Sequence, residues 1–95
     1  MKFEWDENKN LANICKHDFD FKDAEELFSH SGVLVFHDNR KDYSEIRYIG
    51  FGKLKGRIVN MVFTKRNDFI RVISLRKANL REVTLYEKQI KNKLG

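Results

Sequence analysis

The most constraining feature of the sequence is the stretch 69–90, in which the apolar residues change from a period of two to a period of three to four. Up to Lys77, alternation predicts a strand with two distinct faces. One face carries Ile70, Val72 and Ser74, and the other carries Phe69, Arg71, Ile73 and Leu75. The strand is expected to end near Arg76, where a sheet opens to solvent.

After Ala78 the spacing predicts an amphipathic helix. Its apolar stripe comprises Leu80, Val83, Tyr86 or Glu87, Ile90 and Leu94. Asn79 is the expected N-cap, and Glu82, three positions later, can reach back to it as in a capping box. A strand therefore runs almost directly into the last helix.

The first thirty residues predict a short strand and two helices. Residues 1–5 alternate as a half-buried strand, and Asp6 is the expected N-cap of a helix that ends near Lys16 and His17. In this helix the expected inward residues are Leu11, Ile14 and Cys15, and the expected outward residues are Asn8, Lys9, Asn10 and Asn13. Asp20 can cap the second helix, whose apolar stripe is Phe21, Ala24, Leu27 and Phe28. Because each helix has one apolar side, both must pack against a sheet.

Four more strands are expected before the last helix. Strand-like runs cover residues 33–36, 43–54, 57–64 and 69–77. Short turns between them make neighbouring strands antiparallel, so the centre of the domain is a meander. Gly50 and Gly52 indicate a bulge or a close backbone approach. We therefore predict one α+β domain over residues 1–95, with a mostly antiparallel sheet of about four to five strands, two N-terminal helices and one C-terminal helix.

Charge is distributed unevenly along the chain, which has a net charge of +5. Residues 1–30 carry four Lys and eight acidic residues, whereas residues 31–95 carry fifteen Lys or Arg and six acidic residues. Such a basic surface attracts RNA or DNA of any sequence, although it also serves solubility or docks an acidic partner. A charged N-terminus and a single cysteine, Cys15, favour a cytoplasmic protein without a membrane span.

The sequence contains no arrangement typical of a metal or cofactor site. His17, His30 and His37 are well separated, Cys15 lacks a CxxC partner, and no glycine-rich phosphate loop occurs. We therefore expect no metal and no cofactor. The remaining Arg, Lys, His, Glu and Tyr side chains are those needed to cleave RNA through its own 2′-hydroxyl, by a base, an acid and cations that stabilise the phosphorane.

Arg71 and Arg76 are the leading phosphate ligands, because a guanidinium stays charged and its planar fork fits a phosphate. Arg71 is equally well explained by a carboxylate partner or by a stem lying along the sheet. Arg47, on a neighbouring strand, could complete a phosphate clamp.

His17 is a candidate acid or base, since its ordinary pKa is about 6.5, although a histidine at a helix end is more often structural. Glu82, Tyr86 and Tyr48 are further candidates, each with an explanation in capping, packing or stacking that is at least as good.

Two segments and one short motif resemble the BrnT-type toxins, the ribonuclease components of type II toxin–antitoxin pairs. The segment FEWDENKNLANICKHDFDFKDAEELF matches at Phe3, Trp5, Asp6, Lys9, Asn13, Lys16, His17, Phe19, Phe21, Ala24 and Phe28. Glu45 and Arg47 with Gly50 resemble the family's E-x-R strand. The segment RVISLRKANLRE resembles RIISARxAxxxE through Arg71, Ile73, Ser74, Arg76, Ala78 and Glu82.

This resemblance implies a RelE-like fold and metal-independent cleavage of messenger RNA that halts translation. It also implies inhibition by a cognate, BrnA-like antitoxin that binds operator DNA, and repression of their own operon by the pair. Leu75 departs from the small Ala that the family usually has, and its extra branched side chain could narrow a cleft. The alternative is a non-catalytic basic module that acts as a co-repressor or as an RNA-binding domain.

On this interpretation the site residues divide into two groups. The expected catalytic residues are His17, Arg47, Arg71, Arg76, Glu82 and Tyr86. The expected substrate-binding residues are Lys16, Arg66, Lys77 and Arg81.

Overall fold

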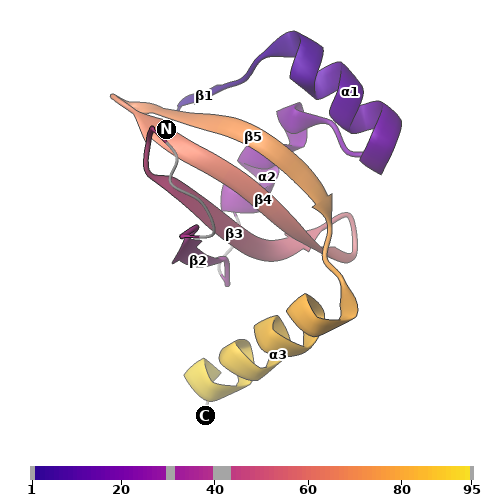
Figure 1. The fold of residues 1–95 in the computed structure, drawn as a ribbon. Coiled ribbons are helices and arrows are strands. Elements are labelled where there is room, and N and C mark those ends of the chain that lie inside the picture. The colour runs from indigo at the N-terminus through magenta and orange to yellow at the C-terminus, as the bar shows by residue number, and fades with distance from the viewer. Residues whose placement is uncertain (1, 30–31, 40–43, 95) are drawn as a thin grey trace.

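A computed structural model describes residues 2–29, 32–39 and 44–94 of the chain. Its elements follow in the order β1 (Lys2–Glu4), α1 (Glu7–His17), the 3₁₀ turn η1 (Phe21–Asp23), α2 (Ala24–Ser29), β2 (Leu34–His37), β3 (Arg47–Leu54), β4 (Arg57–Arg66), β5 (Phe69–Lys77) and α3 (Leu80–Leu94). The five strands form one sheet with the spatial order β1-β5-β4-β3-β2 (Figure 1). The predicted α+β fold is confirmed.

The strands β2 to β5 form the predicted antiparallel meander. Lys55 and Gly56 make the tight turn between β3 and β4, both with positive φ, and Asn67 has the positive φ needed in the turn before β5. The strand β3 begins at Arg47, later than the predicted residue 43, and residues 40–43 lie outside the described part of the chain. The remaining strand, β1, pairs in parallel with the first three residues of β5.

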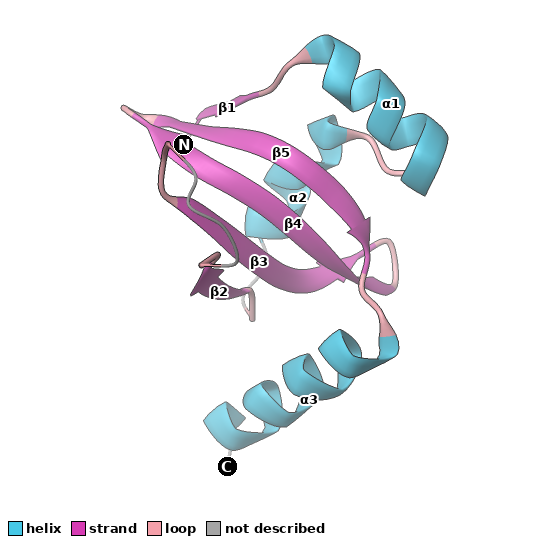
Figure 2. Cartoon of the chain, in the orientation of Figure 1, coloured by secondary structure: helices cyan, strands magenta, loops and turns pink. Residues whose placement is uncertain are grey.

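One face of the sheet is covered by η1 and α2 and forms the main core, while α3 lies against the other face (Figure 2). The core contains Phe19, Phe21, Ala24, Leu27, Leu54, Val59, Met61, Phe63, Ile70, Val72 and Leu75. The close approach expected near the glycines occurs at Gly52, where an added Cβ would lie 2.7 Å from Leu27 Cδ1. Helix α2 can therefore pack directly onto β3.

A β-bulge in β5 changes the predicted distribution of its side chains between the two faces. Val62 pairs with Ser74, but the next residue of β4, Phe63, pairs with Val72, so Ile73 is an extra residue in the ladder. The prediction that Ser74 lies with Val72 is therefore wrong. Leu75, which the simple alternation placed beside Arg71, is fully buried in the main core. It does not narrow a cleft on the opposite face.

The predicted faces of α1 also need correction. Asn10 and Asn13 are buried, whereas Leu11 is 57% exposed and Cys15 is exposed. The side chain of Asn10 bonds Asp20 and the backbone of Phe21, and that of Asn13 bonds the backbone of Phe19 and Leu75. Hydrogen bonds, more than apolar contacts, thus decide which side of α1 faces the domain.

Helix α3 begins with the predicted capping box. The Asn79 backbone N–H donates to Glu82 Oε1, and the Glu82 backbone N–H donates to Asn79 Oδ1, both at 2.9 Å. Tyr86 and Ile90 pack against Leu34 and Phe51 of the sheet. The predicted inward position of Leu80 is wrong, because this side chain is 80% exposed, and the side chain of Leu94 lies outside the described part.

Candidate functional site

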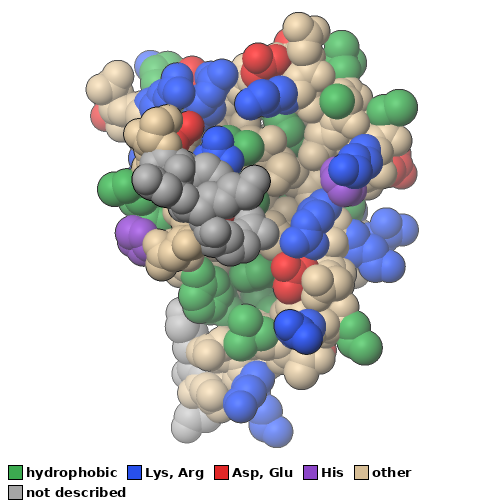
Figure 3. Space-filling model, in the orientation of Figure 1, with side chains coloured by type: hydrophobic (Ala, Val, Ile, Leu, Met, Phe, Trp, Pro, Cys, Tyr) green, Lys and Arg blue, Asp and Glu red, His purple; other side chains and the backbone are tan. Residues whose placement is uncertain are grey.

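The face of the sheet opposite the main core carries polar side chains in rows that run across the strands. Glu4 pairs with Arg71, Arg71 with Thr64, and Thr64 with Arg47, so these residues share one row. A second row contains the polar residues Arg76 and Asn60 and continues with the apolar residues Phe51 and Leu34. Lys and Arg side chains gather over the upper part and the right side of this face in Figure 3. The expected clamp residues Arg47, Arg71 and Arg76 therefore lie on the same face.

The register fixes how far apart these arginines lie. Arg71 and Arg76 pair with Thr64 and Asn60, which are four residues apart on β4, so their backbones are about 13 Å apart at about 3.3 Å per residue. Arg47 and Arg71 are separated by one intervening strand, or about 10 Å at about 4.8 Å per strand. The backbones of the three arginines thus form a triangle wide enough for their side chains to contact more than one phosphate.

Carboxylates from the surrounding elements lie against the first row of cations. Arg71 Nη1 lies 3.5 Å from Glu4 Oε2, and Arg47 Nη2 lies 3.8 Å from Glu45 Oε1. Arg66, an exposed residue at the end of β4, lies 3.8 Å from the other oxygen of Glu45. Partly exposed pairs of this kind are each worth only about 0–1 kcal/mol, so an incoming phosphate can compete with them.

Arg76 is held much more firmly, by Glu82 in the first turn of α3. Its two terminal nitrogens donate to the two carboxylate oxygens of Glu82, both at 2.9 Å. Glu82 also accepts hydrogen bonds from the Asn79 backbone and from Asn60 Nδ2, the latter at 3.0 Å. About 30% of the Arg76 side chain remains exposed. The guanidinium is therefore fixed in orientation, while part of the Arg76 side chain faces solvent.

These contacts set the charge state of Glu82. Burial raises the pKa of the Glu82 carboxyl, but hydrogen bonds from Arg76, Asn79 and Asn60 and the charge of Arg76 outweigh it and hold this pKa below its ordinary value. A carboxylate that already accepts four hydrogen bonds is a weak proton acceptor. Glu82 is better suited to orienting Arg76 than to moving a proton.

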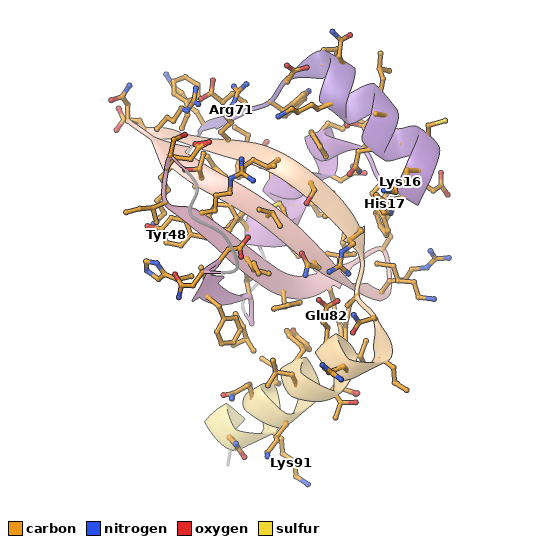
Figure 4. All side chains as sticks on the ribbon, in the orientation of Figure 1. Lys16, His17, Tyr48, Arg71, Glu82 and Lys91 are labelled. Atoms are coloured by element: carbon orange, nitrogen blue, oxygen red, sulfur yellow. The ribbon has the colours of Figure 1, made fainter. Side chains whose placement is uncertain are left out.

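His17 and Lys16 lie at the end of α1, beside the end of β5 (Figure 4). Burial lowers the pKa of the His17 imidazole, and the neighbouring charges of Lys16 and Arg76 lower it further. The imidazole is therefore mostly neutral at pH 7 and can accept a proton. Arg76 therefore lies close enough to the end of α1 for its charge to act on His17.

The two tyrosines are placed elsewhere. Tyr86 is buried, its hydroxyl donates to the Gly32 carbonyl at 3.0 Å, and burial raises its pKa. Tyr48 lies on the core side of the sheet, with its ring stacked on Phe63 at 5.4 Å and Lys65 Nζ 5.2 Å from its centroid. Neither tyrosine is gathered with the arginines.

Of the other expected substrate-binding residues, Lys77 lies on the core side of the sheet, because it pairs with the core residue Val59. Lys16, Lys77 and Arg81 are exposed, with Lys77 directly after Arg76 and Arg81 directly before Glu82. Two residues of the site, Asn13 and Asn60, did not emerge from the sequence as functional candidates. The available signal for Asn60 was that it is a polar residue two positions from both Ile58 and Val62. It therefore lies on the face of β4 that pairs with Arg76.

Within the described residues, no three His, Cys, Asp or Glu side chains are grouped so that they could hold a metal ion. No helix in that part of the chain is long and apolar enough to span a membrane.

The fold and this site define a small α+β domain with a rigid cationic face that suits a polyanion. Residues 5–82 match the family model described as the ribonuclease toxin, BrnT, of type II toxin–antitoxin systems. The match covers most of the chain, and the protein therefore belongs to this family of ribonuclease toxins. No curated protein matches the sequence significantly. RNA as the substrate and an antitoxin as the partner follow from membership of the family.

The Glu82 contacts predict a pH-dependent contribution to stability. Because the folded-state pKa is lowered, the stabilisation is fully present above the ordinary Glu pKa of 4.5 and is lost as the pH falls through the folded-state value. We expect Glu82→Gln to lower the free energy of unfolding by about 1–2 kcal/mol at pH 7 and by much less near pH 3. Urea unfolding at both pH values measures this difference, with Glu87→Gln on the same helix as the control. A loss of equal size at both pH values would contradict the assignment.

Proposed function

We propose that the chain is an endoribonuclease that cleaves messenger RNA through its 2′-hydroxyl without a metal ion and thereby inhibits translation. The observation that carries this proposal is the placement of Arg47, Arg71 and Arg76 on one rigid face, with His17 at the edge beside Arg76. The reaction needs a base for the 2′-hydroxyl proton, cations for the phosphorane and an acid for the leaving oxygen.

The three arginines divide the binding of the RNA backbone between them. Arg76, fixed by Glu82, contacts the reacting phosphate and stabilises the charge that develops on it. Arg71 and Arg47, whose carboxylate partners lie at 3.5 and 3.8 Å, contact neighbouring phosphates. The exposed residues Lys16, Arg66, Lys77 and Arg81 add attraction that does not depend on sequence.

His17 is the residue best suited to accept the 2′-hydroxyl proton. Its lowered pKa leaves it neutral at pH 7, whereas Glu82 is saturated with hydrogen-bond donors and the Tyr86 hydroxyl is engaged by Gly32. As a base, His17 makes the cleavage rate fall when the pH drops through its pKa. Replacement by Gln should remove that acidic limb, and a limb that persists in the variant would exclude His17 as the base.

Cleavage of a defined RNA in EDTA tests the proposal directly. We expect the wild-type chain to cut in EDTA and Arg76→Ala to cut about 10²- to 10³-fold more slowly, the usual cost of removing one charge stabiliser. Arg57→Ala, which removes an exposed arginine at the start of β4, is the matched control and should retain its rate. Activity that requires added metal, or an undiminished rate in Arg76→Ala, would contradict the proposal.

We further propose that a cognate, BrnA-like antitoxin neutralises the toxin in the cytoplasm and that the pair represses its own operon through operator DNA bound by the antitoxin. The basic face supports an acidic partner, and the exposed apolar side chains Val35 and Phe36 on β2 and Leu85 on α3 give that partner apolar contacts. An antitoxin bound there covers part of the surface that RNA needs.

Expression in bacteria tests this relationship. We expect the chain alone to arrest growth and co-expression of the antitoxin from the neighbouring gene to restore it. An operator fragment should be retarded by the antitoxin and more strongly by the complex, because the antitoxin supplies the DNA contacts. Unimpaired growth with the chain alone would contradict toxicity, and arrest that the antitoxin does not relieve would contradict neutralisation.

A binding module without catalysis is the second candidate. It is favoured by one observation, namely that Arg71 and Arg76 each already have a carboxylate partner. This alternative predicts RNA binding that weakens with salt, without cleavage. The assay in EDTA separates the two.

A further inference from the structure

The buried side chain of Asn13 makes three hydrogen bonds that join α1 to the rest of the domain. Its Nδ2 group donates to the Phe19 carbonyl at 2.9 Å and to the Leu75 carbonyl at 2.8 Å, and its Oδ1 accepts from the Leu75 backbone N–H at 3.2 Å. Both amide protons and the amide oxygen are thereby used. Such a fully satisfied buried amide fixes the position of the groups that it joins.

The contact with Leu75 replaces a strand that is missing at that point. Along its outer edge β5 pairs with β1 only from Phe69 to Arg71. Among the described residues, no other strand pairs with the rest of that edge. Asn13 bonds both the N–H and the carbonyl of Leu75, as a neighbouring strand would do. Helix α1 is therefore joined to the edge of β5 through its side chains.

The position of this contact in the sequence gives it a functional consequence. Leu75 directly precedes Arg76, and Asn13 lies about one helical turn, or about 5–6 Å, before His17. We propose that Asn13 is a positioning residue of the ribonuclease, which fixes the end of α1 so that His17 and Lys16 share one site with Arg76. This role rests on the proposed function, in which His17 and Arg76 act on the same phosphodiester.

The same helix supplies a matched control for a purely structural role. Asn10 is also a buried asparagine of α1, and its side chain bonds Asp20 and the Phe21 backbone N–H. It joins α1 to η1 and makes no hydrogen bond to β5. Substitution of either asparagine removes buried hydrogen bonds, but only Asn13→Ala releases the helix end from the neighbourhood of Arg76.

Titration of the His17 ring by NMR reports its position without any need for catalysis. The charges that act on His17 are those of Lys16 on its own helix and Arg76 on β5, and together with burial they lower its pKa below 6.5. In Asn13→Ala we expect the midpoint to move up toward 6.5, because the ring leaves Arg76 and gains water. In Asn10→Ala we expect the midpoint of the wild type.

Kinetics of RNA cleavage provide the second readout. Asn13→Ala should lower kcat at least tenfold with KM changed less than threefold, since the other cations still bind RNA. The acidic limb of its pH–rate profile should move up with the His17 midpoint, whereas Asn10→Ala should keep both kcat and profile within threefold. Should Asn13→Ala fail to fold, Asn13→Ser, which keeps one hydroxyl donor and acceptor, carries the same test.

The outcomes separate this proposal from the proposed function. A folded Asn13 variant with an unchanged His17 midpoint overturns the positioning role, whatever its activity. A shifted midpoint with unchanged kcat also overturns it, because the position of His17 would then not matter to the reaction. A wild-type chain that does not cut RNA contradicts the proposed function. The variant His17→Gln identifies the acidic limb of the pH–rate profile, on which both the proposed function and the positioning role depend.

Discussion

A single extra residue in β5 determines what this face of the sheet can do. Two side chains five positions apart on a regular strand point to opposite faces, but the bulge opposite Val62 and Phe63 brings Arg71 and Arg76 to the same side. The same bulge leaves Leu75 in the main core. Leu75 lies between Arg71 and Arg76 in the sequence and anchors the strand in the core. This anchor fixes the spacing of the two arginines along β5.

Each arginine of the site has a carboxylate partner, and the ion pairs differ in strength. Arg71 Nη1 lies 3.5 Å from Glu4 and Arg47 Nη2 lies 3.8 Å from Glu45, whereas Glu82 holds Arg76 through two short hydrogen bonds. The difference suits a division of labour in which Arg76 is preorganised and the other arginines bind a flexible backbone. Preorganisation of this kind means that no reorientation is needed when charge develops on the phosphate.

Much of the fold followed from periodicity and turn residues. The meander, the capping box of α3 and the turns at Lys55–Gly56 and Asn67 are local features, and the sequence predicts local features well. The bulge could not be predicted, because it depends on how Val62 and Phe63 meet a neighbouring strand. The parallel pairing of β1 with β5 is equally non-local.

The candidate site was predictable in part for the same reason. Arg47, Arg71, Arg76 and His17 could be selected by chemistry and by family resemblance, and the structure has the three arginines on one face of the sheet with His17 near Arg76. The roles of Glu82 and Tyr86 could not be separated, since their partners Asn60 and Gly32 are distant in sequence. Asn13 and Asn10 were misplaced on the outer side of α1, because a polar residue is usually exposed unless a specific hydrogen-bond partner is provided.

The central claim is that Arg71, Arg76 and His17 face one RNA strand. It is tested most directly by NMR of the chain with a short 2′-O-methyl RNA, which lacks the attacking hydroxyl and so stays intact. We predict that the side-chain resonances of Arg47, Arg71, Arg76 and His17 shift together on binding, with a midpoint that weakens as salt is added. Shifts confined to α2 and the core side of the sheet, with these four side chains unchanged, would contradict the account.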